Sequence, residues 1–207
     1  MIDYFILYFF VLLITLSFIG YGLLLCNFID KNLLLKNIGY IGLSGFFLCT
    51  IISYLTIFFT KHGYIHNLIF HFFGISLFLL FLFKRNINFD LKKFLIIFSV
   101  LFIGLLISRN HDDFNYYHLT YSLGLTENKL IFGLGNLGHG YTHHSSIFFL
   151  NSIIFLPYVK HFLFHSIGWI TLFFVNLILI DKLLDKNKKY LNFEFFFLFT
   201  FFFIYKF

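Results

Sequence analysis

Residues 4–26 read YFILYFFVLLITLSFIGYGLLLC, an apolar stretch without a single charged side chain. A transmembrane helix needs about 20 consecutive, mostly apolar residues, and this stretch is long enough. The composition agrees, because 60% of the chain is hydrophobic, the mean hydropathy is +0.89, and 12% is charged, against about 25% in soluble domains. The sequence therefore predicts an integral membrane protein of the all-α class.

Five further apolar stretches follow along the chain. They cover residues 37–60, 64–83, 93–108, 162–180 and 192–207. Another apolar piece, 146–158, is too brief to span alone and is ended by Pro157, so we expect an interfacial or re-entrant helix there. The fold prediction is thus a polytopic α-helical membrane protein with about six transmembrane helices.

Basic residues predict the orientation, because Lys and Arg collect on the cytoplasmic side. If residues 109–161 form an extracytoplasmic loop, ten basic residues fall in cytoplasmic turns and four lie outside. The ten are Lys31, Lys36, Lys84, Arg85, Lys92, Lys93, Lys182, Lys186, Lys188 and Lys189; the four are Lys61, Arg109, Lys129 and Lys160. We therefore expect the amino terminus and a loop with short juxtamembrane helices outside. The excess of Lys and Arg in cytoplasmic turns also accounts for the net charge of +6. The sequence carries no signal of nucleic-acid binding.

Three units follow from this reading. Residues 1–92 are N-terminal transmembrane helices, and 93–180 form a unit that holds the loop 109–161. Residues 181–207 are a cytoplasmic turn and a final helix, which is either complete or truncated. Cys26 and Cys49 both lie in apolar stretches, so they indicate neither a disulfide framework nor a metal pair.

Residues 109–146, RNHDDFNYYHLTYSLGLTENKLIFGLGNLGHGYTHHSS, form a polar island in this apolar chain. The island holds three of the nine acidic residues and five of the ten histidines. Asp112 and Asp113 stand where the fourth helix reaches the membrane surface. One of them is expected to cap a following helix, and two like charges so close raise one pKa, as in a base or metal ligand.

A second helix is expected from about Phe114. Phe114, Tyr117, Tyr121 and Leu125 then form an apolar stripe suited to packing on lipid or on other helices. His118 lies off that stripe, near Asn115 and in register with His111, so these polar groups either share a cleft or are solvated.

The second half of the island holds four glycines and three histidines. Gly133, Gly135, Gly138 and Gly140 favour a tight surface turn over a phosphate-binding loop, because no strand–glycine–helix pattern surrounds them. His139, His143 and His144 have a spacing that suits a divalent metal, with an aspartate as third ligand, but no metal motif is present. Ser145 and Ser146 are expected to cap the short apolar helix.

The run DDFNYYH, followed by FGLGNL and HHSS before an apolar helix, resembles polytopic GT-C-type glycosyltransferases and an uncharacterised bacterial membrane family related to them. The resemblance covers residues 103–169. It implies a multi-pass protein of the bacterial inner (plasma) membrane that transfers a sugar from a polyprenyl-phosphate donor. The chain departs from that pattern in having three spans before the loop, and His144 where the related family has Asn.

The resemblance also implies roles for the island's side chains. By this resemblance, Asp112 or Asp113 would be the general base that deprotonates an acceptor hydroxyl. Our hypothesis takes Asp113 as the base and Asp112 as its partner or as a metal ligand. Arg109 would contact the donor phosphate, assisted by His111 and His118. Asn136 and His144 are the remaining substrate-binding candidates; no cofactor is firmly indicated.

Two other functions fit the same composition. In the first, the chain is a non-catalytic component of cell-surface polysaccharide assembly or export, and the island is a docking or gating loop. A channel or transporter is less favoured, because its helices should be broken by Gly or Pro or carry intramembrane charges.

Overall fold

The computed structural model describes residues 3–29, 37–84, 87, 89–107, 113–138, 142 and 145–184. This part of the chain contains seven α-helices and no β-strand. In chain order these are α1 (Tyr4–Ile29), α2 (Ile38–Thr56), α3 (Tyr64–Lys84), α4 (Leu91–Ile107), α5 (Leu119–Glu127), α6 (Ser146–Ile153) and α7 (Ser166–Leu184). The all-α class is confirmed within the described residues.

Within the described residues, four stretches are long and apolar enough to cross a membrane. They are Tyr4–Ile29, Ile38–Thr56, Tyr64–Lys84 and His161–Leu183, and each coincides with a predicted span. The stretch 93–108 corresponds to α4, which has 17 residues and is shorter than these four. The predicted span 192–207 lies outside the described residues.

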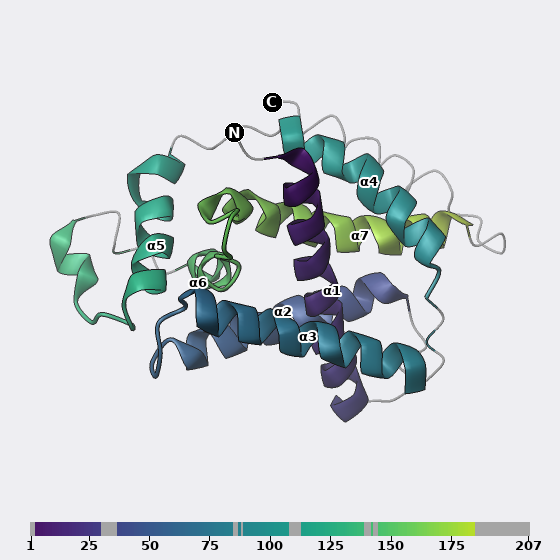
Figure 1. Cartoon of the computed structure of the whole chain (residues 1–207), viewed down its shortest axis with the longest axis horizontal. Helices are drawn as coiled ribbons and strands as arrows, with labels where there is room; N and C mark the ends of the chain where they lie inside the picture. Colours follow the sequence, from purple (N-terminus) through teal and green to yellow (C-terminus); the bar gives the residue numbers. More distant parts are fainter. Residues whose placement is uncertain are drawn as a thin grey trace.

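Helix α1 is the centre of the bundle, because it packs against both α2 and α3 (Figure 1). Small residues allow these close approaches. A Cβ atom placed on Gly45 of α2 would lie 1.7 Å from the main-chain oxygen of Phe18, and one on Gly20 would lie 1.9 Å from that of Gly74 in α3. Glycine at such crossings lets two helix backbones touch, as is common between transmembrane helices.

Aromatic side chains pack α4 against α7 and against the N-terminal part of α1. The indole Nε1 of Trp169 donates to the main-chain oxygen of Leu101 at 2.8 Å, and its ring meets Phe98 edge-on. Tyr8 of α1 contacts Phe98 and hydrogen-bonds to Ser99 of α4 at 2.9 Å. Because one hydrophobic core contains side chains from α1 to α4 and from α7, helices on both sides of the predicted boundary at residue 92 pack together.

One end of the bundle gathers the starts of α2 and α4 and the end of α7. Asn37, which caps α2, donates to the main-chain oxygen of Leu177 at 3.1 Å and also contacts Asp181. Asp181 forms an ion pair with Lys93 of α4. The α2–α3 turn, α6 and the start of the α7 span lie together away from this end. We call that region, residues 57–63 and 113–165 as described, the outer end.

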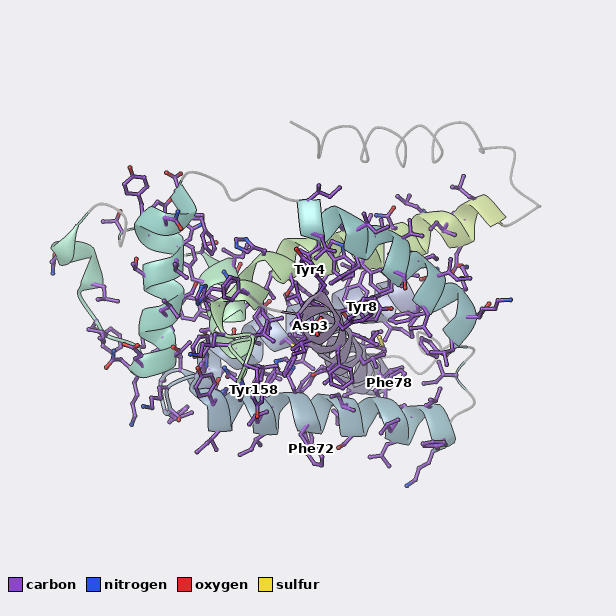
Figure 2. The ribbon with its side chains drawn as sticks, turned by 45° about the horizontal axis from the view of Figure 1, so that its top comes forward. Asp3, Tyr4, Tyr8, Phe72, Phe78 and Tyr158 are labelled. Atoms are coloured by element: carbon purple, nitrogen blue, oxygen red, sulfur yellow. The ribbon has the colours of Figure 1, made fainter. Side chains whose placement is uncertain are left out.

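The outward faces of the spans are apolar. In α3, Phe72 points away from the bundle and is 74% exposed, while Phe78 points inward and is 6% exposed (Figure 2). Large exposed apolar faces are costly in water and suit contact with lipid. The exposed fraction of these side chains therefore supports a membrane protein.

Helix α6 has eight residues and is too short to span a membrane alone, as expected for the apolar piece 146–158. It ends at Ile153, before Pro157, and every residue from Phe148 to Ile153 is buried. It packs against α2, α3, α5 and α7. The helix is thus enclosed by protein instead of lying on the surface.

Candidate functional site

Asp113 occupies the N-cap position of η2 (Phe114–His118), a π-helical turn that leads directly into α5. Its side chain makes no capping hydrogen bond. Short π-helical turns are rare and occur frequently at functional sites. The other residues predicted around Asp113, namely Arg109, His111 and Asp112, lie outside the described residues.

The predicted apolar stripe on η2 and α5 is confirmed. Phe114, Tyr121 and Leu125 are buried; Phe114 belongs to the main core, whereas Tyr121 and Leu125 belong to a small separate cluster against which Tyr117 packs. This cluster also contains Ile57 of the α2–α3 turn and Phe148 and Phe149 of α6. The stripe therefore attaches α5 to other helices.

His118 lies at the end of η2 and turns toward α6. Its ring centroid is 4.5 Å from that of Tyr117 and 5.0 Å from that of Phe148, whereas Asn115 is exposed. Asn136 lies on the short 3-10 helix η3 (Leu134–Leu137) and is exposed. Because η3 and α6 lie on opposite sides of α5 in Figures 1 and 2, the structure separates Asn136 from the face to which His118 turns.

The glycine-rich segment contains the predicted tight turn. Gly133 has φ +83°, a left-handed conformation that favours glycine, and its main-chain oxygen accepts from the amide of Asn136 at 3.0 Å. Ser145 caps α6, as predicted, by accepting from the amide of Ile147 at 3.4 Å. His139, His143 and His144 lie outside the described residues. Elsewhere in the described chain, no three His, Cys, Asp or Glu side chains are grouped to hold a metal.

A buried polar cluster at the outer end has Asn67 of α3 as its hub. The side-chain amide nitrogen of Asn67 lies within hydrogen-bond distance of the main-chain oxygens of His62, Ser152 and Phe155, at 2.8, 2.8 and 2.9 Å, so its two N–H groups are shared among three acceptors. Two of these oxygens belong to the last turn of α6 and the residues after it, where a helix leaves carbonyls without intrahelical partners. Asn67 thus fastens α6 and the α2–α3 turn to α3.

His62 lies in the α2–α3 turn and is fully buried. Its Nδ1 is 2.6 Å from the hydroxyl of Ser152, and its Nε2 is 2.9 Å from the hydroxyl of Thr56. Burial, together with the neighbouring His66, lowers the pKa of His62 to about 3. The ring is therefore neutral near neutral pH and carries a single N–H.

The hydrogen atoms around His62 are too few for all of these contacts. The Thr56 hydroxyl also bonds the main-chain oxygen of Ile52 at 2.9 Å, and the Ser152 hydroxyl that of Phe149 at 2.7 Å. Each hydroxyl has one proton, and carbonyl oxygens only accept. With a neutral His62, one hydroxyl must turn its proton from the carbonyl to the ring. The cluster therefore has two alternative hydrogen-bond arrangements.

His71 lies one turn after Asn67 in α3 and joins α1 to the last residue of α6. Its Nε2 is 3.1 Å from the main-chain oxygen of Ile153, so this nitrogen carries the proton. In the neutral ring, Nδ1 then accepts from the hydroxyl of Ser17 at 3.1 Å. His66 hydrogen-bonds to the side-chain oxygen of Asn67 at 2.9 Å and stacks on His62 at 4.7 Å between ring centroids.

The predicted site residues did not include His62, His66, Asn67, His71 or Ser152. Polar residues in or beside transmembrane helices are a signal in themselves, since they are rare and usually paired. That signal marks His62, His66, Asn67 and His71 as a group. It does not reveal their partners on α1 and α6.

No protein-family model matches the chain, and no curated protein or solved structure was found to be similar to it.

Proposed function

We propose that the chain is a multi-pass protein of the bacterial plasma membrane that acts in the transfer of a sugar from a polyprenyl-phosphate donor to an extracytoplasmic acceptor. The observation that supports this most is the position of Asp113. It begins a π-helical turn at the point where the polar island enters the juxtamembrane helices. A carboxylate there would meet a lipid-linked donor, whose phosphate lies at the membrane surface.

The arrangement of helix ends supports the topology in this proposal. Asn37, Lys93 and Asp181 meet at one end, so α2 and α4 start where α7 finishes. The α2–α3 turn, α6 and the start of the α7 span meet at the outer end. With the basic turns of the sequence on the cytoplasmic side, the loop 109–161 would be outside. Six spans would include α4 and residues 192–207.

In the proposed chemistry, Asp113 removes a proton from the acceptor hydroxyl as that oxygen attacks the anomeric carbon. The bond from that carbon to the donor phosphate breaks, and the polyprenyl phosphate leaves with the electron pair. Arg109 and His111 would contact this phosphate, and Asp112 would orient Asp113 or bind a divalent metal. His118, Asn136 and His144 are the remaining candidates for contacts with the substrates.

The test is a sugar-transfer assay on the full-length protein in liposomes that contain polyprenyl-phosphate sugars with a radiolabelled sugar. Asp112→Asn/Asp113→Asn should abolish transfer while leaving the thermal unfolding midpoint unchanged. Glu127→Gln, which neutralises an exposed carboxylate at the other end of α5, is the matched control and should keep activity. Undiminished transfer by the double variant would refute the assignment.

A second function, a non-catalytic component of polysaccharide assembly or export, is favoured by the buried polar cluster. The side chains of His62, Asn67 and Ser152 bond to one another or to main-chain oxygens, which suits a rigid docking unit. This function predicts that Asp112→Ala/Asp113→Ala reduces co-purification with partner proteins without loss of a chemical step.

A further inference from the structure

Four large apolar side chains are exposed where the α2–α3 turn meets the loop after α5. Phe58 and Phe59 belong to the turn and are 51% and 78% exposed; Ile131 and Phe132 belong to the loop and are 49% and 81% exposed. We call these four residues the apolar rim.

The loop presents Ile131 and Phe132 because its backbone is held in place. The amide of Leu130 donates to the main-chain oxygen of Ile57 at 3.2 Å, which joins the loop to the turn. Leu130 and Leu134 both pack against the buried cluster around Ile57. With the loop anchored on either side, Ile131 and Phe132 face outward. Figure 1 shows the end of α5 beside the α2–α3 turn.

The apolar rim continues the outer face of α2. Phe47, Ile51, Leu55 and Phe58 are exposed at helical spacing along this candidate span. The ring centroid of Phe58 lies 6.4 Å from that of Phe132, so the exposed stripe passes from the helix to the loop. The same surroundings therefore contact the exposed face of α2 and the loop. Around a transmembrane helix these surroundings are lipid.

The charged residues beside the apolar rim suit the edge of a bilayer. Lys61 and Lys129 are exposed and flank the turn and the loop, with the exposed Glu127 as the acidic neighbour. Aromatic side chains next to lysine are typical of the membrane–water interface, where the ring lies among lipid carbonyls and the ammonium group reaches the phosphates.

We propose that the apolar rim is inserted in the bilayer interface, so that the loop 130–134 lies on the lipid surface instead of extending into water. The occupant of this surface is phospholipid. The inference depends on the membrane-spanning character of α2 and is independent of sugar transfer. It would bring the segment that carries Asn136 to the depth of lipid head groups.

Tryptophan fluorescence in liposomes tests the proposal. Trp169 is the sole tryptophan, so Trp169→Phe gives a background without one. In that background, Phe132→Trp should be quenched by phosphatidylcholine brominated near the carbonyl end of its chains, and should emit at shorter wavelength than Asn128→Trp. Asn128, an exposed polar residue at the end of α5, is the matched control and should be quenched by iodide in the water instead.

Equal iodide access and equal emission for the two variants would overturn the proposal. A second result would also overturn the proposal. In it, Phe132→Trp emits at short wavelength, is not quenched by brominated lipid, and changes its emission with the protein-to-lipid ratio. A second copy of the chain, and not lipid, would then cover the apolar rim.

If Trp169→Phe fails to fold, a spin label at Phe132→Cys in Cys26→Ala/Cys49→Ala gives a second measurement. The label should be more accessible to oxygen than to a water-soluble nickel complex, and the reverse order would refute insertion.

Discussion

The side-chain amide nitrogen of Asn67 lies 2.8 Å from the main-chain oxygen of Ser152, a residue 85 positions further along the chain. Both residues are buried. This contact joins α3 to the end of α6 and is accompanied by two further bonds from the same nitrogen. The Asn67 amide therefore adds a polar contact to the apolar packing that holds α6, and α5 packs on α6 in turn.

We predict that Asn67→Ala destabilises the fold, because the main-chain oxygens of His62 and Phe155 lose the Asn67 donor, at a cost of about 1–3 kcal/mol each, whereas that of Ser152 keeps the amide of Phe155 at 3.4 Å. Asn115→Ala, at an exposed position in η2, should have little effect. Thermal unfolding in detergent micelles, compared between the two variants, measures the difference. Equal unfolding midpoints would show that Asn67 does not hold α6.

The second prediction concerns the pH dependence of stability. The pKa of His62 is about 3 in the folded protein and near its ordinary value of 6.5 when unfolded. Between these pH values the unfolded chain binds a proton that the folded chain does not. His62 should therefore lower the free energy of unfolding as pH falls from about 6.5 toward 3, by at most about 1.4 kcal/mol per pH unit. Above pH 6.5 this contribution is constant.

His62→Gln supplies the control for this prediction, because glutamine can hydrogen-bond at the site but does not titrate. Because of His62, the unfolded state of the unchanged protein binds up to about one more proton than the folded state. In His62→Gln this difference in bound protons should be smaller by about one. The two proteins differ at this one side chain, so the difference between their stability curves reports the removal of His62. Parallel stability curves from pH 3.5 to 7.5 would contradict the lowered pKa.

The long helices were predictable because hydrocarbon-compatible sequence is a local property. Residues 4–26, 37–60 and 64–83 each coincide with a helix of the bundle to within a few residues at their ends. The stripe from Phe114 to Leu125 was predictable for the same reason, since its spacing alone puts four side chains on one face. Gly133 and Ser145 also have local roles, in a turn and a helix cap.

The candidate site was less predictable because its partners are distant in sequence. His62 meets Ser152 across 90 positions, and His71 meets Ser17 across 54. No periodicity within α3 or α6 indicates these pairs. The direction of His118 toward Phe148 likewise depends on how α5 packs on α6. The roles suggested for Asp113 and Asn136 remain predictions.

The third prediction tests the turn that presents the apolar rim. Gly133→Ala places a Cβ on a residue with φ +83°, which costs about 1–2 kcal/mol for an L-residue. Gly124→Ala in α5 has open space and helical backbone, so it should be neutral or slightly stabilising. In the Phe132→Trp reporter, Gly133→Ala should change the emission maximum and Gly124→Ala should not. If both leave it unchanged, the turn does not fix the position of Phe132.

The fourth prediction tests the glycines at the centre of the bundle. Gly45→Ala would place a methyl group 1.7 Å from the main-chain oxygen of Phe18, so α1 and α2 must move apart. Overpacking of this kind costs about 1–3 kcal/mol or more, because the obstacle is backbone and cannot rotate away. Gly104→Ala in α4 meets no atom within 4 Å and should be neutral or stabilising. Thermal unfolding of the two variants in the same micelles distinguishes them. Alanine is the better helix former at both positions, so a lower unfolding midpoint for Gly45→Ala alone would be attributable to the crossing with α1. Equal unfolding midpoints would mean that the two helices do not approach as closely as Phe18 and Gly45 indicate.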